Sequence, residues 1–392
     1  MKKLRFQIRT WNRAKKLEIC VRRIAEEVIK IGAEKDCIIF VIDNCSSDST
    51  PKVLKELKKE FPFIVTYRYP KWCKMGEFLP IPDEILEKTK AEFIWNMGDD
   101  DIILKDTLPL VWNLLNSDKT KNFVIIHVAN ASLSPHSYKT YEGTVLEFAN
   151  LMGFNQFLGY SPSVIFNFLY REEKFKEWGE DYIQEVFFKK YRPLYQTTAF
   201  PHVLFYLHFF AYDPAIVIDY PIVEPMSPQK EEDLKRWEKE NIGWKYFLVP
   251  KALKFMYEEG ILKEKLKPGF FKYLNYNLWD RFLTEMIAAR LGIYTRNPRP
   301  DEGWKYILDI ADLIDDPTIV KQIRTNVYLA RGLCKEYQFL KKKLETISDK
   351  ETLLKKDLEN RLNEMKKTLL ETYQEIIKPV FEEGWAGRGY KK

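Results

Sequence analysis

One stretch decides the fold class of this chain: Phe93-Ile-Trp-Asn-Met-Gly98, followed by Asp99-Asp100-Asp101 and then Ile102-Ile-Leu104. The apolar run predicts a β-strand, and three adjacent carboxylates follow it directly. Adjacent carboxylates repel each other and resist leaving water, so a cation among them stabilises the cluster. Hard oxygen atoms favour Mg²⁺ or Mn²⁺, which usually reach a protein together with a phosphate group. The stretch therefore indicates either a site for a metal-bound phosphate or a solvated acidic turn that caps the next helix.

The sequence around this stretch alternates between strand and helix patterns. Apolar runs predict strands at residues 4–8, 37–42, 63–67, 93–97 and 123–128. Helical spacing predicts helices at 17–31, after Pro51, around Ile85 and Leu86, and after Thr107. This order implies an α/β fold with a doubly wound, mainly parallel sheet. Ligands bind such sheets beyond the carboxyl ends of the strands, where the loops 43–50 and 98–101 are expected to lie.

The second half of the chain has a weaker pattern. From about residue 140 it predicts aromatic-rich helices and a last strand at 215–219, with an exit loop at 220–223. Residues 230–335 predict a helical region, and a long charged helix is expected after Gln338. A capping box of Ser348 and Glu351 can split that helix. The expected domains are an α/β domain over 1–228, a helical domain over 229–337, and a long amphipathic helix with a flexible tail over 338–392.

Composition limits the partners. The net charge of +6 in 392 residues suits phosphorylated ligands or an anionic membrane surface and is too dilute for nucleic acid. The five cysteines include no CxxC pair and favour a reducing compartment. Charges interrupt the start of the chain, so no signal peptide is expected, and no apolar run is long enough to cross a bilayer. We expect a cytoplasmic protein, either soluble or peripheral on the inner membrane face.

Three segments at strand ends carry a resemblance: Thr10-Trp-Asn-Arg13, Val41-Ile-Asp-Asn-Cys-Ser-Ser-Asp-Ser-Thr50 and Trp95-Asn-Met-Gly-Asp-Asp-Asp-Ile-Ile-Leu104. Together they resemble the T-Y-N-R entry, the V-D-N-G-S-T-D-x-T loop and the DXD segment of the family 2 glycosyltransferases, which have the GT-A fold. The G-D-D-D form is similar to the abequosyltransferase-like branch, whose members add sugars to polysaccharide repeat units. Cys45 departs from the loop glycine, which predicts a different turn geometry. The N-x-G segment is missing, with only Lys74-Met-Gly76 nearby, so Lys71 or Lys74 is expected to contact the diphosphate instead.

The resemblance implies an activity and a donor. It implies transfer of a sugar, with inversion, from a UDP, GDP, CDP or dTDP sugar to a hydroxyl of a polysaccharide, glycan or lipid-linked saccharide. A divalent cation, Mn²⁺ or Mg²⁺, would neutralise the leaving diphosphate. By resemblance, Asp99 and Asp101 hold the metal, and Asp99 and Asp100 belong to the donor site, although Asp100 can also serve only to shape the turn.

The resemblance also implies a nucleotide pocket. Asp43 would face the nucleobase, and the residues that line the pocket are Thr10, Asn12, Arg13 and Asn44. From the residues alone, other roles remain open. Asp43 can cap a turn, Asn12 can cap the next helix, and Arg13 can be a surface charge.

The catalytic base has three candidates. His202 lies where the family's acidic residue precedes a helix, and a histidine titrates near neutral pH, so it can accept the acceptor's proton. It can also be a metal ligand or a hydrogen-bonded core histidine. Asp181 and Glu185 are the carboxylate alternatives.

Two rival functions remain. A sugar-phosphate nucleotidyltransferase has a similar sheet and metal site, but its glycine-rich loop is missing from the Gln7–Arg13 segment. A non-catalytic nucleotide-binding scaffold would use the C-terminal helix to bind a partner.

The apolar seam of the C-terminal helix has several possible roles. It can form a coiled coil or a homo-oligomer, dock on the catalytic domain, lie on an anionic membrane, or pack on its own chain. The seam residues are Leu340, Leu344, Ile347, Leu354, Leu358, Met365 and Leu369.

Overall fold

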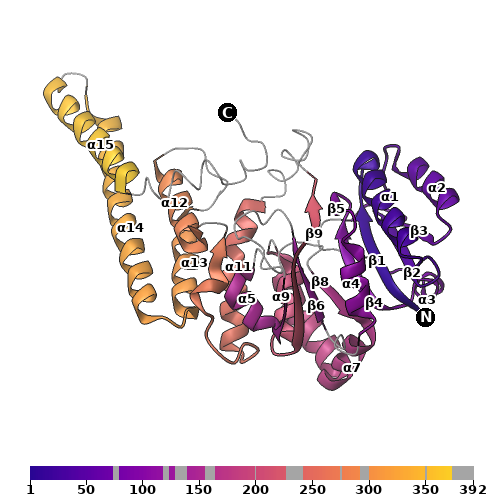
Figure 1. Cartoon of the computed structure of the whole chain (residues 1–392). Helices are drawn as coiled ribbons and strands as arrows, with labels where there is room; N and C mark the ends of the chain where they lie inside the picture. Colours follow the sequence, from indigo (N-terminus) through magenta and orange to yellow (C-terminus); the bar gives the residue numbers. More distant parts are fainter. Residues whose placement is uncertain are drawn as a thin grey trace. The chain divides into compact units, whose positions relative to one another are not determined.

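The computed structural model of the chain describes residues 1–73, 79–117, 123–128, 139–154, 164–198, 200–226, 242–273, 276–291, 300–348 and 351–372. The chain divides into two units. The first contains residues 1–196 and 201–226, and the second contains residues 197–200 and 227–392. Figure 1 shows the sheet of the first unit and the helices α11 to α15 of the second.

The first unit is built on one mixed sheet with the strand order β3-β2-β1-β4-β8-β6-β9-β5, and β7 pairs with β9. The strands β3, β2, β1 and β4 are parallel to one another, as are β6 and β9. The predicted α/β class with a mainly parallel sheet is therefore confirmed. The strands are β1 (Lys2–Thr10), β2 (Cys37–Asp43), β3 (Ile64–Arg68), β4 (Ala91–Gly98), β5 (Asp101–Ile103), β6 (Phe123–Val128), β7 (Thr140–Thr144), β8 (Val164–Asn167) and β9 (Pro214–Pro225).

Helices cover the sheet because their apolar faces need burial. Strand β2 is buried along its whole length, as its continuous apolar sequence predicted. One side of the sheet packs against α1 and α4 in a single core, and residues around α3 cover Ile38, Phe40 and Ile42 on the other side. The helices of this unit are α1 (Ala14–Lys30), α2 (Thr50–Glu60), α3 (Asp83–Lys88), α4 (Leu108–Leu115), α5 (Val145–Met152), α7 (Phe168–Trp178), the π-helix η2 (Tyr182–Tyr191), α8 (Arg192–Gln196) and α9 (Pro201–Phe210).

Three strands depart from the sequence prediction. The prediction of a loop at 220–223 is wrong. Strand β9 continues to Pro225 and pairs there with β5 through Val223 and Ile103. Strand β8 inserts antiparallel between β4 and β6, so the sheet is mixed. Both β5 and β8 are short, and their partners lie far away in sequence, so no local pattern announces them.

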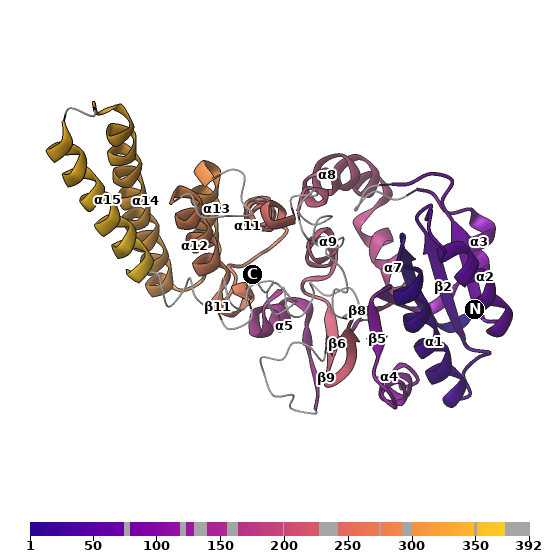
Figure 2. The same ribbon diagram turned by 90° about the horizontal axis from the view of Figure 1, so that it is seen from above.

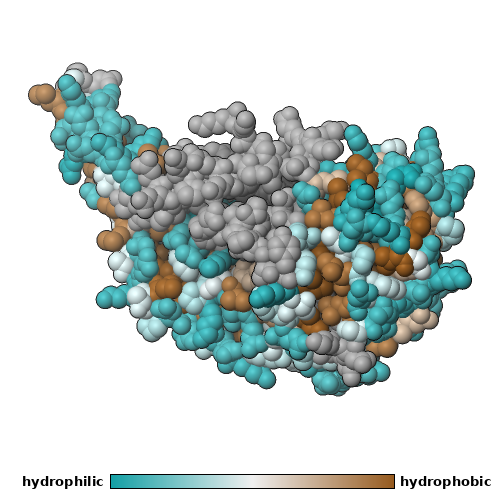
Figure 3. Space-filling view, in the orientation of Figure 1, coloured by the Kyte–Doolittle hydropathy of each residue, from teal (hydrophilic) through white to brown (hydrophobic). Residues whose placement is uncertain are grey.

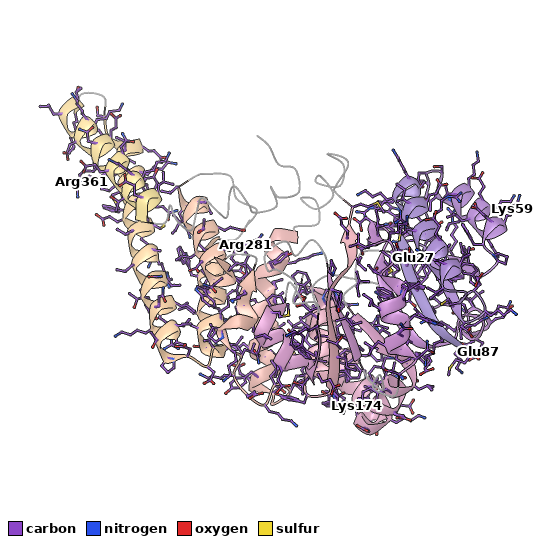
Figure 4. The ribbon with its side chains drawn as sticks, viewed as in Figure 1. Glu27, Lys59, Glu87, Lys174, Arg281 and Arg361 are labelled. Carbon is purple, nitrogen blue, oxygen red and sulfur yellow. The ribbon has the colours of Figure 1, made fainter. Side chains whose placement is uncertain are left out.

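One buried carboxylate fixes the chain just after β5. Glu27 on α1, labelled in Figure 4, is buried, and its carboxylate accepts the backbone N–H of Asp106 over 3.1 and 3.2 Å. Asp106 has a φ of 66°, a strained conformation for a residue other than glycine. The contact therefore holds the turn that follows the aspartates.

The second unit is helical over most of its described residues, as predicted for 230–335. Its elements are α11 (Ile242–Glu258), the 3₁₀ helix η3 (Pro268–Phe271), β10 (Lys272–Tyr273), β11 (Tyr276–Asn277), α12 (Leu278–Arg290), α13 (Pro300–Leu313), α14 (Pro317–Thr346) and α15 (Thr352–Thr372). None of the helices that the structure describes has the length and apolar content to span a bilayer.

The long C-terminal helix starts earlier than the sequence predicted. Asp316 caps α14 by accepting the backbone N–H groups of Thr318 and Ile319, and Pro317 fills the first turn. The helix ends at Thr346, and α15 folds back alongside it (Figures 1 and 2). The predicted break near Ser348 and Glu351 is confirmed. The predicted boundary at residue 337 falls inside α14, and the three-domain division remains a prediction.

Candidate functional site

Three parallel strand ends meet at one edge of the sheet. Strand β1 lies between β2 and β4, and the register pairs Thr10 with Asp43 and Arg9 with Gly98. The loop after β2 and the aspartates after β4 therefore flank the segment that follows β1. This confirms that the two polar loops share the carboxyl edge of the sheet.

Asp99 is the centre of a buried polar cluster. It is only 4% exposed; the Thr10 hydroxyl donates to its Oδ2 over 2.7 Å, and Arg13 Nη1 donates to its Oδ1 over 2.8 Å. Arg13 Nη1 also lies 3.1 Å from Asp100 Oδ2, and Lys16 Nζ lies 4.0 Å from the same atom. Burial raises the pKa of Asp99, while Arg13 opposes the shift and Asp100 adds to it. Arg13 is therefore a protein cation among the carboxylates.

The carboxylate of Asp101 holds the turn that follows β4. Its Oδ2 accepts the backbone N–H of Gly98 over 2.7 Å. A Cβ atom on residue 98 would lie 2.6 Å from that same oxygen, so the close approach requires glycine. The backbone N–H of Met226 donates to the Asp100 carbonyl over 2.6 Å and ties the turn to the end of β9.

Asp43 is buried with one oxygen unsatisfied. It is 1% exposed, and its Oδ1 accepts the backbone N–H of Ser46 over 2.9 Å. Among the residues that the structure describes, none donates a hydrogen bond to its Oδ2, and the cation of Arg68 Nη1 lies 3.7 Å away. A buried carboxylate oxygen without a donor is costly, and an N–H group of a ligand would satisfy it.

Comparison with known proteins agrees with the motifs. Residues 7–179 match the model of glycosyl transferase family 2. The matched region contains the strand ends just described, and the match supports a family 2 glycosyltransferase. The abequosyltransferase-like branch stays a prediction. No curated protein matches the chain at a significant level.

Solved structures with similar folds have low identity to the chain. TarS of S. aureus has a TM-score of 0.46 and 12% identity over 85% of this chain, which spans 55% of TarS. TarS 1–349 in complex with UDP-GlcNAc has a TM-score of 0.46 and 13% identity, covering 86% of this chain and 91% of that one. The mannosyltransferase PcManGT from Pyrobaculum calidifontis, in complex with GDP-Man and Mn²⁺, has a TM-score of 0.44 and 12% identity, covering 98% and 87%.

Two asparagines of the matched region brace its loops. Asn12 Oδ1 accepts the backbone N–H of Ser47 over 2.7 Å, and Asn44 Oδ1 accepts that of Cys73 over 3.0 Å. Their direct contact with a nucleotide remains a prediction. Cys45 has a φ of 59°, the left-handed conformation that favours glycine. The predicted change of turn geometry relative to the family stays a prediction.

The structure adds residues to the site that sequence reasoning missed. The rings of Trp11 and Trp72 lie 5.7 Å apart, next to Asn12 and Cys73, and Trp72 is exposed. Lys16 and Arg68 bring cations to Asp100 and Asp43. The position of Trp11 between Thr10 and Asn12 was a usable signal, whereas nothing in the sequence pairs it with Trp72. Lys71 is exposed, and Lys74 lies outside the described residues.

The two histidines of α9 have different surroundings. His202 is half-buried in the first turn and shares a face with Tyr206, whose ring lies 6.3 Å away. Tyr206 is buried, which raises its pKa to about 12, and it hydrogen-bonds to Asn96 of β4. This contact places that face of α9 against the strand that leads to Asp99.

His208, by contrast, is a core histidine. Its Nε2 lies 2.9 Å from the Tyr182 hydroxyl and its Nδ1 lies 2.7 Å from the Tyr195 hydroxyl. Burial lowers its pKa to about 3. The sequence predicted the core-histidine alternative for His202 and nothing for His208.

The carboxylate candidates lie on the surface. Asp181 is exposed just before η2, and Glu185 is exposed and pairs with Lys189 one turn along η2. Both side chains face solvent. Their role as base stays a prediction with no support from their surroundings.

The aspartates fit a divalent ion that shares its shell with a ligand. Among the described residues, no group of three or more His, Cys, Asp and Glu side chains could hold a metal ion by itself. Mg²⁺ and Mn²⁺ are commonly held by one or two carboxylates, with phosphate oxygens and water completing the shell. Both Asp99 oxygens already accept hydrogen bonds, and Asp100 is the most exposed of the three. The donor set therefore suits an ion that arrives with a diphosphate.

Proposed function

We propose that this chain transfers a sugar, with inversion, from a nucleotide-diphosphate donor to an acceptor hydroxyl, with Mn²⁺ or Mg²⁺ as cofactor. One observation carries the proposal. Within the family 2 region, the carboxylate with an unsatisfied oxygen, Asp43, and the Thr10–Asp99–Arg13 cluster lie on adjacent strand ends. A nucleotide needs both a base-recognising acceptor and a charged site for its phosphates, and this edge offers the two side by side.

Asp43 is assigned to the nucleobase. Its Oδ2 can accept a ring N–H, which uracil, thymine and guanine present and cytosine does not. Trp11 and Trp72 offer π-faces next to the same loops, and base–aromatic stacking contributes about 1–3 kcal/mol. The amino group of cytosine can also donate to a carboxylate, so we expect a UDP, dTDP, GDP or CDP sugar at this site.

The aspartate turn is assigned to the ribose and diphosphate. We place the metal on Asp101 and Asp99, as the resemblance implies, with Asp100 as a further oxygen donor near Arg13. When bound, the metal ion neutralises charge that develops on the leaving diphosphate. Arg13 and Lys16 hold the aspartates in place and limit the repulsion between them.

His202 is assigned to the acceptor's proton. The acceptor oxygen bonds to the anomeric carbon as the carbon–oxygen bond to the diphosphate breaks on the opposite face. The electron pair of the broken bond leaves with the nucleoside diphosphate, and the hydroxyl proton moves to the imidazole of His202. The acceptor is a saccharide or a lipid-linked saccharide. A peripheral membrane location and a homo-oligomer remain predictions.

A donor screen tests this function. The purified chain is mixed with UDP, GDP, CDP and dTDP sugars, with and without Mn²⁺, and both the thermal midpoint and the released nucleoside diphosphate are measured. We expect a metal-dependent rise of the midpoint and slow release of diphosphate with at least one donor. Proton NMR of a transferred sugar then reads the anomeric configuration, and retention would contradict the inverting reaction.

The rivals give different results in the same screen. A nucleotidyltransferase releases pyrophosphate from a nucleoside triphosphate and a sugar phosphate. A non-catalytic scaffold binds the nucleotide but releases no diphosphate above background. No feature of the described residues favours either rival over transfer.

A further inference from the structure

The outer face of α14 carries cations and aromatic rings in one line. Between residues 321 and 343, side chains spaced by three, four or seven residues share this face. All are exposed: Tyr328 by 61% and Phe339 by 68%. We call this set the basic-aromatic face; its members are Lys321, Arg324, Tyr328, Lys335, Phe339, Lys342 and Lys343.

Few acidic side chains lie near this face. The acidic residues of α14 are Glu336 and Glu345; Glu336 lies at the edge of the face, three residues before Phe339 and seven before Lys343. Arg324 pairs with Asp312 over 2.7 Å, so the four lysines supply most of the charge. At 1.5 Å per residue the row is about 33 Å long, and the two aromatic side chains lie about 16 Å apart.

Part of the seam noticed in the sequence is buried inside the hairpin of α14 and α15. Leu340, Leu358 and Leu369 are buried, and α15 packs along α14. The buried side of α14, which includes Val327 and Cys334, lies opposite the basic-aromatic face. The two helices of the hairpin therefore bury apolar side chains against each other. The exposed outer side of α14 is left as a surface for another partner.

The end of the hairpin carries two exposed leucines that are close in sequence to lysines. Leu353 is 88% exposed and Leu354 is 42% exposed, at the start of α15. They follow closely on Lys341, Lys342 and Lys343, at the end of α14. Figure 3 shows hydrophilic residues over most of the hairpin in that view and hydrophobic residues at its upper end.

We propose that the basic-aromatic face of α14, together with the hairpin end, docks on an anionic lipid bilayer. A row of exposed cations along one helix face fits a continuous anionic plane, where each lysine contributes to attraction. Aromatic side chains lie favourably at headgroup depth, and lysine stems can pack there while their ammonium groups reach the phosphates. An acidic protein would offer scattered charges rather than a plane. The surface does not depend on the sugar-transfer reaction.

Vesicle binding tests the proposal with charge-matched variants. The full chain is sedimented with vesicles of phosphatidylcholine alone and with added phosphatidylglycerol. We expect binding only to the anionic vesicles and weaker binding in high salt. The variant Lys335→Glu with Lys342→Glu and Lys343→Glu is expected to lose about a hundredfold in partitioning. The matched control reverses three exposed lysines of α2, Lys52, Lys55 and Lys59, of which Lys59 is labelled in Figure 4.

The aromatic part is tested separately. Tyr328→Ser with Phe339→Ser keeps every charge, so a tenfold or greater loss of vesicle binding supports insertion of the rings. Circular dichroism confirms that each variant retains its helices.

Four outcomes overturn the proposal. Equal loss in the α2 control would show that only net charge matters, and unchanged binding by the α14 triple variant would remove the face from the contact. Binding to poly-L-glutamate but not to anionic vesicles would assign the face to an acidic macromolecule. A dimer in sedimentation velocity that the Phe339 variant dissociates, without vesicle binding, would assign it to a second copy of the chain.

Discussion

The Arg13 guanidinium donates to Asp99 Oδ1 over 2.8 Å, and both side chains are largely buried. The pair joins the segment after β1 to the turn after β4, two places that are 86 residues apart in the chain. Because burial raises the pKa of Asp99, the carboxylate depends on Arg13 and Thr10 to stay charged. The same pair therefore supports both the shape and the charge of the proposed donor site.

Removal of Arg13 should leave a buried charge without its partner. We expect Arg13→Ala to lower the free energy of unfolding by about 3 kcal/mol and to abolish donor binding, measured by urea unfolding and calorimetric titration. The control is Arg22→Ala, which breaks the surface pairs with Glu18 and Glu60 and should cost less than about 1 kcal/mol. Equal effects of the two substitutions would contradict the assigned role of Arg13.

Gly98 should tolerate no side chain. In Gly98→Ala the new methyl group would lie 2.6 Å from Asp101 Oδ2, so the carboxylate must leave the Gly98 N–H group. We expect a loss of about 1–3 kcal/mol in stability and weaker metal-dependent donor binding. Gly332→Ala on α14, where no described atom lies within 4 Å of the added methyl group, should stabilise the chain by up to about 1 kcal/mol. Unchanged donor binding in Gly98→Ala would show that the Asp101 turn is not needed.

His202 should affect turnover and not donor binding. We expect His202→Ala to lower kcat by roughly 10²–10⁴ while the dissociation constant of the donor stays the same. Asp181→Asn and Glu185→Gln should leave turnover close to that of the unaltered chain, because both side chains are exposed. Full turnover of His202→Ala with intact donor binding would remove His202 as the base.

His208 should make the free energy of unfolding depend on pH. The unfolded chain protonates this histidine near its usual pKa of 6.5, whereas burial lowers the pKa in the folded chain to about 3. Between these values the unfolded state binds the extra proton, so stability is retained above pH 6.5 and falls by up to about 1.4 kcal/mol per pH unit below it.

A matched pair of variants isolates this effect. His208→Gln removes the titrating group and leaves a polar side chain for Tyr182 and Tyr195, so its urea-unfolding free energy should differ less between about pH 7 and about pH 5. His202→Gln makes the same change in the same helix at a half-buried position and should keep the original difference. Identical pH dependence in the unaltered chain and His208→Gln would contradict the buried, neutral imidazole.

The sequence predicted the parts of the fold that local patterns encode. The runs of β1, β2 and β4 and the caps after β2 were sufficient to place Thr10, Asp43 and Asp99 at one edge of the sheet. Contacts between distant segments were out of reach, such as β8 beside β4, β5 beside β9, and Asn44 against Cys73. Spacing also showed which residues of α14 and α15 share a face, but it did not show that the two helices pack on each other.

Nucleotide binding by a variant of Asp43 tests the central claim most directly. Calorimetric titration measures UDP and GDP binding in the presence of Mn²⁺ for the unaltered chain, Asp43→Asn, and the control Asp83→Asn, an exposed aspartate at the start of α3. We predict that at least one nucleotide binds, that Asp43→Asn weakens it by about 10- to 100-fold, and that Asp83→Asn leaves it unchanged. Binding that is the same in all three proteins, or no binding of either nucleotide to the unaltered chain, would contradict a nucleotide site at this edge of the sheet.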